Sequence, residues 1–523
     1  MKFLRVLCVV ALVAFFAASA YAETQNVKVS GDLAVRAFFR DCYGGDQSFT
    51  ASPNEQVDPV NAAMGAAINT RKGLSRSNSN WFMSTTELQV DADLTDNVST
   101  CIRLLNQRDW NAAKGSNYNQ NTQVSTIGSG GFGHSNNGFT NGGGAGYYDD
   151  SDEFAVDLEL AYVTLKNFLY SPLTVTIGRQ NLWFGKGFIV GANQRLRNAA
   201  NYGMGFFTQP LTAPEYTAQN AFDSVKSVLD FDPWTLTAIY SRIWQNDIRS
   251  DDGLDLWGAN VGYKFDAYKG EAEGYWFFKR DMQVQPYNWD DPAGSNEINT
   301  LGLRGSFDPI DIITLYAEFA GQFGTYAGNQ LQGNNRARVA GALDVGGESR
   351  YFTDKWAWKP KFGVEYIWYS GDAENVQANG SGQYHGWDPM FRGKTDSLIR
   401  EFIGKYYWSV QYPFTPTNYY TSADNSFQNQ HQLIFKGSLQ PMDSLKLTGN
   451  LNMFWNQEAY DERTMKTRGY IGTEVDMGAT WDYTEDVQFG LAAGWFVPGF
   501  VYYNDQGTAA TATDVVGTVK VSF

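Results

Sequence analysis

The chain has 523 residues, a formal net charge of −16, 18% charged residues and 15% aromatic residues. The negative balance argues against nucleic acid as a partner, because binding phosphates requires a surplus of Lys and Arg. Beyond the first 22 residues, no stretch approaches the roughly 18 apolar residues of a membrane-spanning helix. An aromatic-rich chain with 53 glycines and few helical patterns is predicted to be all-β, either soluble or a membrane barrel.

Residues 1–22 have the pattern of a secretory signal peptide. Lys2 and Arg5 precede an apolar run over residues 6–18, and Ala-Tyr-Ala at the end of the segment supplies a small-x-small cleavage pattern. The run is too short for a membrane anchor, and small residues follow it. We therefore predict cleavage before Glu23.

Alternation of apolar and polar residues recurs along residues 23–523, and no Pro-rich linker divides them, so a single domain is predicted. A clear example runs from Ile313 to Phe323. Segments of about ten residues with a period of two are typical of a transmembrane antiparallel β-barrel. We predict about 18 strands, with 16 as the alternative because those near 222 and 254 are the least distinct. The predicted strands begin near residues 31, 80, 98, 152, 172, 222, 234, 254, 269, 296, 311, 335, 356, 430, 444, 467, 486 and 510.

The predicted connections alternate between short and long. Tight turns are expected at 96–97, 170–172, 232–233, 308–311, 441–443 and 485–486. Long polar stretches are expected at 43–79, 113–151, 188–221 and 373–429. Short periplasmic turns and long extracellular loops are what bacterial barrels have. A barrel of this width is expected to enclose an aqueous channel.

The last predicted strand ends on an aromatic residue. Val519, Val521 and Phe523 lie on its apolar face and are predicted to form the signal that the outer-membrane barrel-assembly machinery reads. This strand should pair with the first one and remove the open edge that lipid does not tolerate. The predicted location is the bacterial outer membrane, with its lipid as a partner.

Strand parity predicts which charged side chains line the pore. The basic set is Arg36, Arg40, Arg103, Arg179, Arg304, Arg338, Lys361, Lys436 and Lys446. The acidic set is Asp157, Glu159, Glu318, Glu365, Glu474 and Asp476, and the same parity points Glu271, Glu273 and Asp344 inward. The bases could hold and pass anions, or they could pair with these carboxylates and only stiffen the wall.

One irregularity is expected near Gly178. The apolar parity set by Ile177 changes by Leu182, so one strand is predicted to absorb an extra residue in a glycine bulge. The bulge would turn Arg179 into the lumen, because an Arg facing lipid at the membrane centre costs about 2–4 kcal/mol.

Aromatic residues are expected in two places. Those predicted to form an interfacial girdle on the lipid face are Tyr366, Trp368, Trp481, Tyr483 and Trp495. Those on the lumen face are Tyr275, Tyr316 and Tyr369, which are better candidates for contact with a sugar than the girdle residues.

Four segments carry a resemblance to a known family. They are "LTVTIGRQNLWFGKGFIVG" at 173–191, "KPKFGVEYIWYSGDAE" at 359–374, "HQLIFKGSLQPMDSLKLTGNLNMFW" at 431–455 and "YIGTEVDMGATWDYTEDVQFGLAAGWFVPG" at 470–499. Together they resemble the alginate-export family of outer-membrane barrels. The resemblance implies an 18-stranded pore and, in the family's namesake, export of an anionic polysaccharide through a basic lumen.

The predicted function is a monomeric porin-type channel for anionic or sugar-like solutes, with possible periplasmic export partners. The alternatives are a nonselective diffusion porin and a surface-binding or adhesion barrel whose loops plug the lumen. No catalytic residues, cofactor or metal site are predicted, because His134, His385 and His431 lack a nucleophile or ligand-type spacing. A disulfide between Cys42 and Cys101 is disfavoured, because the two are expected at opposite ends of spanning strands.

Overall fold

The computed structural model describes fourteen parts of the chain. They are residues 26–41, 79–110, 156–193, 213–244, 253–282, 295–326, 336–353, 355–372, 382–402, 427–457, 460–461, 466–467, 469–499 and 511–523. The predicted signal peptide, Cys42, His134 and the predicted loop 113–151 lie outside these residues. No helix in the described parts is both long and apolar enough to cross a membrane.

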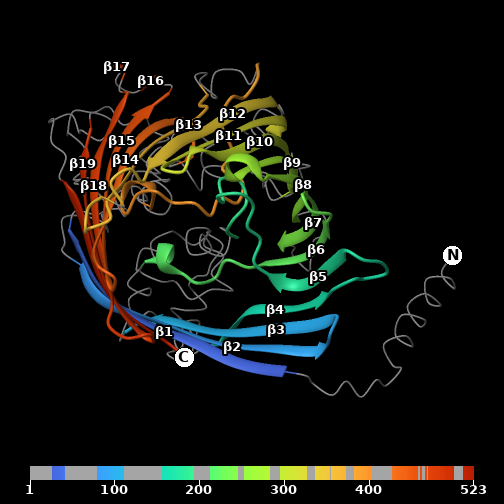
Figure 1. The fold of residues 1–523 in the computed structure, drawn as a ribbon. Helices are drawn as coiled ribbons and strands as arrows, with labels where there is room; N and C mark the ends of the chain where they lie inside the picture. Colours follow the sequence, from blue (N-terminus) through green and yellow to red (C-terminus); the bar gives the residue numbers. More distant parts are fainter. Residues whose placement is uncertain are drawn as a thin grey trace, which may run out of the picture.

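Eighteen antiparallel strands form the wall of a closed barrel (Figure 1). They are β1 (Asn26–Asp41), β2 (Ser79–Thr95), β3 (Val98–Asp109), β4 (Asp157–Leu165), β5 (Leu173–Gln180), β6 (Phe222–Asp230), β7 (Trp234–Trp244), β8 (Leu254–Phe265), β9 (Gly270–Asp281), β10 (Asn296–Ile310), β11 (Ile313–Tyr326), β12 (Arg336–Ser349), β13 (Lys361–Tyr369), β14 (Gln430–Met442), β15 (Leu445–Asn456), β18 (Tyr470–Asp482), β19 (Val487–Pro498) and β20 (Ala512–Ser522). The strands predicted near 222 and 254 are both present, so the prediction of 18 strands is confirmed and the alternative of 16 is wrong. Beside the wall, β16 (Tyr460–Asp461) pairs with β17 (Lys466–Thr467) in a separate ribbon.

The barrel closes between its first and last strands. β1 pairs with β2 on one side and with β20 on the other. Gly31 and Phe523 exchange two backbone hydrogen bonds, each 2.9 Å long. Because each of the eighteen strands has a neighbour on both sides, the wall presents no unpaired edge to lipid.

The alternation along each strand separates an outer face from an inner face. On β11, Glu318 is 5% exposed while the adjacent Phe319 is 54% exposed, and on β10 Leu303 is 70% exposed. Large apolar side chains this exposed are satisfied when the outer face meets hydrocarbon. Trp481 and Trp495 belong to the same outer face.

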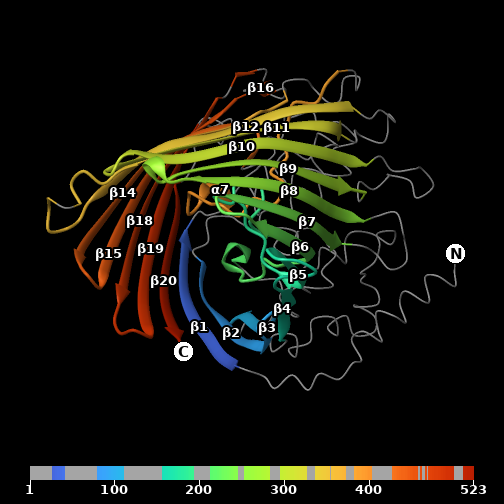
Figure 2. The same cartoon turned by 45° about the vertical axis from the view of Figure 1, so that its right-hand side comes forward.

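The two ends of the barrel differ in their connections (Figure 2). At one end, which also carries the start of β1 and the end of β20, the turns are short: residues 96–97, 311–312 and 483–486 are examples. A short 3-10 helix, η5 (Ala267–Lys269), joins β8 to β9 at this end. The long connections leave from the other end, as the alternating pattern predicts.

Three described segments of the long connections lie within the ring of strands (Figures 1 and 2). The first inner segment is residues 181–193, the second is 213–221 and includes η4 (Pro214–Tyr216), and the third is 382–402 and includes α7 (Arg400–Phe402). Their apolar side chains pack against inward residues of the wall: Phe391 contacts Phe222 at 5.6 Å between ring centroids. Parts of two predicted extracellular loops, 188–221 and 373–429, therefore fold back into the barrel.

Candidate lumen site

The third inner segment is held to the wall through Lys394. Its Nζ lies 2.5 Å from Asp344 Oδ2 and also pairs with Glu365, both on inward faces of neighbouring strands. Lys436 on β14 pairs with the same Glu365 and reaches Asp396 of the inner segment at 2.7 Å. Two cations therefore bridge three carboxylates between wall and segment. This arrangement satisfies charges that burial would otherwise penalise.

A second attachment lies on β18. The Glu474 carboxylate accepts backbone N–H groups from Leu398 (2.7 Å), Ile399 (2.8 Å) and Arg400 (2.7 Å). Asp476 accepts the side-chain amide of Asn452 at 3.2 Å. A carboxylate at the amino end of a helical turn satisfies N–H groups that have no partner within the turn.

The third segment also closes on itself. Glu401 accepts the backbone N–H groups of Asp396 (2.7 Å) and Ser397 (3.2 Å), while Ser397 Oγ accepts the N–H of Glu401 at 3.0 Å. Burial raises the pKa of Glu401 to about 7, although Arg392 opposes the rise. The guanidinium of Arg392 lies 4.4 Å from the Phe427 ring centroid and donates to the Tyr369 hydroxyl.

The start of the third segment is fixed by aromatic and polar contacts with β11 and β12. Tyr384 stacks on Tyr326 with centroids 3.7 Å apart, and the Arg338 guanidinium lies 4.9 Å from the Tyr384 ring. Arg338 also donates to the carbonyl of Gly386 at 2.6 Å. Arg338, predicted to line the pore, is therefore buried beneath this segment.

The second inner segment is tied to the other side of the wall. Arg40 on β1 pairs with Glu215 of the segment and, at 3.1 Å, with Asp514 on β20. Glu159 accepts the backbone N–H groups of Asn220 and Ala221 at 2.8 and 2.9 Å. These contacts bring residues far apart in the sequence to one place on the inner face.

Two further predicted side chains meet the same segment. Gln219 donates to Asp157 at 2.7 Å, and the Arg36 guanidinium lies 5.5 Å from the Tyr216 ring. Arg36 also donates to Thr85 at 3.0 Å. Asp157 and Arg36 both remain partly exposed.

The prediction of a bulge near Gly178 is wrong, because the structure places the irregularity on the neighbouring strand β4. Pairing runs without a shift across Gly178 in both of its ladders. The shift lies one strand earlier, where Leu158 and Leu160 oppose consecutive residues of β3 and leave Glu159 as the extra residue. The parity change that suggested the bulge arises because β5 ends at Gln180 and the chain then enters the first inner segment.

Arg179 lies at this junction. It is 3.6 Å from Glu159 and 3.4 Å from Asp223, so it is paired with carboxylates on both neighbouring strands. Gly178 has a φ of +126°, and a Cβ there would collide with the carbonyl oxygen of Ala161. The position requires glycine for its backbone conformation and for this close approach.

The first inner segment places Lys186 among charged groups of the wall. Its Nζ lies 2.7 Å from the ring centroid of Tyr316. Burial and, next, the charge of Lys394 lower the pKa of Lys186 to about 8, against the opposing effect of Asp344 and Glu365. A Lys with this pKa changes charge near neutral pH.

Arg304 lies beside the same segment. It pairs with Glu271 at 2.5 Å and with Glu273. Nearby, Tyr275 donates its hydroxyl to Glu318 at 2.7 Å. The charges of these neighbouring strands are thus largely satisfied within the wall.

The remaining predicted bases are more exposed to solvent. Arg103 pairs with Glu87 at 3.4 Å and donates to the amide oxygen of Gln89. Lys361 lies 4.0 Å from Glu348. The exposed Lys446 has no ion pair within the described residues.

Burial divides the predicted pore-lining charges by sign. Five of the six acidic side chains are buried: Glu159, Glu318, Glu365, Glu474 and Asp476. Only two of the nine bases are buried, and seven keep exposed surface: Arg36, Arg103, Arg179, Arg304, Lys361, Lys436 and Lys446. Among the predicted pore-lining residues, more carboxylates than bases are therefore buried.

The predicted aromatic residues also differ in how far their side chains are buried. Tyr275 and Tyr369 are buried by their hydroxyl partners and by neighbouring rings, so they offer no free face to a solute. Tyr316 is covered by Lys186. Of the girdle residues, Trp368 donates to Gln457 and Tyr366 bonds His431 at 2.6 Å, while Trp481 and Tyr483 remain exposed.

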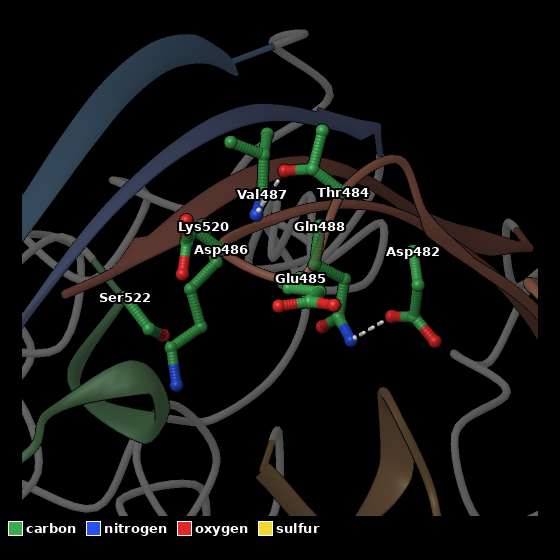
Figure 3. A pocket seen from close by; sticks show the side chains of 8 residues that line it. All are labelled: Asp482, Thr484, Glu485, Asp486, Val487, Gln488, Lys520 and Ser522. Atoms are coloured by element: carbon green, nitrogen blue, oxygen red, sulfur yellow. Dashed lines mark hydrogen bonds between the residues drawn. The ribbon is translucent and has the colours of Figure 1, made fainter.

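A small recess lies at the short-turn end, between the β18–β19 turn and the end of β20 (Figure 3). Gln488 donates to Asp482 across it at 2.7 Å. Lys520 and Ser522 line its other side, and Lys520 pairs with Asp32 on β1 at 3.3 Å. The recess belongs to the rim of the barrel and contains none of the predicted pore-lining residues.

The structure holds functional candidates that strand parity missed. Lys186, Arg392 and Lys394 lie on inner segments, where no alternation marks them. A signal was available in the sequence: Phe188, Ile189 and Val190 form an apolar run inside a loop, and all three are buried. Such a run indicates packing against the barrel interior rather than an exposed loop.

In the described parts of the chain, no three His, Cys, Asp or Glu residues are placed to hold a metal ion. His385 contacts the carbonyl of Val339 at 2.9 Å, and Cys101 is a buried free thiol. Because Cys42 lies outside the described residues, the expected absence of a disulfide between Cys42 and Cys101 stays a prediction.

Comparison with solved structures shows the same fold at low sequence identity. OpdQ of Pseudomonas aeruginosa is 11% identical, with 96% of this chain and 98% of that chain covered and a TM-score of 0.50. OccAB1 of Acinetobacter baumannii is 8% identical, with 97% and 99% covered and a TM-score of 0.50. No curated protein matches the sequence.

The family comparison covers most of the chain. The profile of the family described as alginate export matches residues 69–516. This match includes strands β2 to β19 and all three inner segments, and it agrees with the resemblance carried by the four sequence motifs. The chain belongs to the alginate-export family and forms a porin-type β-barrel of the bacterial outer membrane.

Proposed function

We propose that the channel passes anionic or sugar-like solutes through a lumen whose accessible charge is mainly positive. The observation that carries this proposal is the division of burial by sign: most of the predicted acidic side chains are covered, and most of the bases keep exposed surface. A charged ring in a narrow aqueous path selects ions by sign. Buried carboxylates contribute less, because hydrogen bonds and paired cations offset their charge.

The bases predicted to line the pore are proposed to act as successive weak contacts rather than as one binding site. Arg36 and Lys446 have no ion pair within the described residues, so their charge is available to a solute. Arg179 and Arg304 each pair with two carboxylates and contribute chiefly to the wall. Passage requires contacts strong enough for entry and weak enough for release.

The proposal is tested by the reversal potential of the purified full-length protein in planar bilayers under a KCl gradient. The double variant Arg36→Glu and Lys446→Glu exchanges two accessible positive charges for negative ones. We expect the reversal potential to move toward that of a cation-preferring channel. The double variant Lys355→Glu and Lys359→Glu makes the same charge change on a turn outside the lumen and serves as the matched control.

An unchanged reversal potential in the double variant would show that these bases do not set selectivity. Uptake by proteoliposomes tests which solutes pass the channel. A galacturonate trimer should enter faster than a cationic polyamine of similar size. Equal uptake of both, with no ion preference, would favour the nonselective diffusion porin.

The plugged surface-binding barrel is the second candidate, and the inner segments favour it. Three segments enter the lumen, and the second and third are anchored by buried ion pairs and by backbone hydrogen bonds to Glu159 and Glu474. A barrel closed in this way would give no conductance steps in bilayers, whereas a narrowed channel gives small, well-defined steps.

We also propose how the barrel is assembled and with which partners it acts. Val519, Val521 and Phe523 would be read by the barrel-assembly machinery, with Phe523 hydrogen-bonded to Gly31 in the completed wall. The channel is proposed to act as a monomer, without catalytic chemistry, and to receive or deliver its solute through periplasmic export partners.

A further inference from the structure

The first inner segment carries an exposed indole inside the barrel. Trp183 is 56% exposed, and it is the one large hydrophobic side chain so exposed among the described residues of the three inner segments. Exposed aromatic residues on the strands face outward, where lipid accounts for them. Trp183 lies beyond the end of β5, on a segment that turns inward, so lipid does not account for its exposure.

Three glycines from two segments form a seat for this ring. A Cβ on Gly187 would lie 2.5 Å from Cζ2 of the indole, one on Gly191 would lie 2.9 Å from Cε3, and one on Gly393 would lie 2.7 Å from Cζ3. Both halves of the six-membered ring therefore rest on bare backbone. A ring packed this closely against backbone, yet more than half exposed, leaves another part of its surface open to the lumen.

The seat is fixed by hydrogen bonds. The indole Nε1–H donates to the carbonyl of Gly185 at 3.0 Å. The N–H groups of Gly393 and Lys394 both donate to the carbonyl of Gly187, at 2.9 and 3.1 Å. The buried ring of Phe277 meets Phe184 at 5.1 Å and holds the next residue of the segment against the wall. The ring is thus preorganised, which reduces the entropy lost when a ligand binds.

Charged groups of both signs lie beside this part of the segment. A Cβ on Gly185, whose carbonyl accepts the indole N–H, would lie 2.8 Å from Cδ of Arg304 and 3.7 Å from Oε2 of Glu318. Arg304 and Lys394 are paired with carboxylates of the wall, so their charge is largely offset. Lys186 lies three residues along the same segment as Trp183, and no carboxylate among the described residues lies within ion-pair distance of it.

We infer that Trp183 is a stacking platform for a sugar ring in the lumen, and that Lys186 on the same segment favours a sugar that carries a carboxylate. The C–H groups on one face of a pyranose meet the negative face of an aromatic ring favourably. This inference rests on the proposed function and adds a specific contact to it. The platform holds each sugar briefly as the chain passes, and Lys186 is the nearest cation on the same segment.

The test measures the block of single-channel current by oligosaccharides in planar bilayers, using full-length protein. The probes are a galacturonate hexamer and cellohexaose, which is neutral and has the same number of rings. Trp183→Ala should weaken the block by both probes by about tenfold, in line with the energy of one aromatic stacking contact. Trp183→Phe keeps a flat ring and should stay within about threefold of wild type.

Trp495→Ala is the control, because it removes an indole from the outer face of the wall. It should leave the block unchanged. If Trp183→Ala blocks like wild type, or if Trp495→Ala weakens the block equally, the platform is overturned. The same holds if a conducting, anion-preferring wild-type channel is blocked by neither probe, and in that case the proposed function stands. A wild-type protein without conductance overturns the proposed function itself.

Discussion

The carboxylate of Glu474 on β18 accepts the backbone N–H of Arg400 at 2.7 Å, so the barrel wall caps a helical turn that lies in the lumen. The same carboxylate takes two more N–H groups from the residues before Arg400. One side chain of the wall therefore binds three consecutive N–H groups at this end of the third inner segment.

Replacing Glu474 by Gln should loosen that segment. The substitution removes the charge and turns one acceptor into a donor that faces an N–H group. Losing charge-assisted hydrogen bonds costs about 1–3 kcal/mol. We expect noisier open-channel current in single-channel recordings, with the barrel still folded. Glu485→Gln, an exposed position in the turn between β18 and β19, is the control and should record like wild type.

Replacing Lys394 by Met should have a larger effect on stability. The substitution leaves Asp344, Glu365 and Asp396 without one of their shared cations. Removing one partner from buried charges typically costs 3–5 kcal/mol. The temperature at which the barrel unfolds should fall, as measured by the loss of its compact mobility on gels after heating. An unfolding temperature equal to that of Lys355→Met, on an exposed turn, would contradict this role.

Ion preference should depend on pH through Lys186. Because burial and Lys394 lower the pKa of Lys186 to about 8, it is charged below that pH and neutral above it. The preference for anions should therefore decrease as the pH rises from about 7 to 9. Reversal potentials measured across this range in Lys186→Met should be flat. A slope that persists in this variant would assign the titration to another group.

The seam between the first and last strands should be sensitive to one methyl group. A Cβ on Gly31 would lie 2.6 Å from the Phe523 ring and 2.7 Å from the carbonyl oxygen of Glu87. Gly31→Ala should lower the fraction of protein that reaches the compact, heat-modifiable form. Gly517→Ala is the matched control, because nothing lies within 4 Å of a Cβ at that position on β20. Equal folding of the two variants would show that the seam tolerates the clash.

The wall could be predicted from the sequence because lipid imposes a strict pattern on it. Each residue pointing outward must be apolar, so alternation marks each strand, and tight turns mark one end. The predicted strand starts agree with the structure to within about five residues; β1, for example, begins at Asn26 rather than near 31. Even the two least distinct strands are present.

The inner segments could not be predicted in the same way, because their contacts are with distant residues. Lys394 is positioned by Asp344 and Glu365, which lie on earlier strands. Trp183 is positioned in part by Gly393, which is more than 200 residues away in the sequence. The misplaced bulge has the same origin. Leu182 is apolar because it packs inside the barrel, and the pattern was interpreted as if it still belonged to the wall.

Arg40 joins Glu215 and Asp514, so the two ends of the wall and a segment from the middle of the chain meet at one guanidinium. Loop closure over such long spans is entropically unfavourable until other contacts have brought the groups together. The junction is complete only when the strand that carries Asp514 has docked. Until β20 pairs with β1, the β1 edge has no partner on that side, so the same docking step closes the wall and completes this junction.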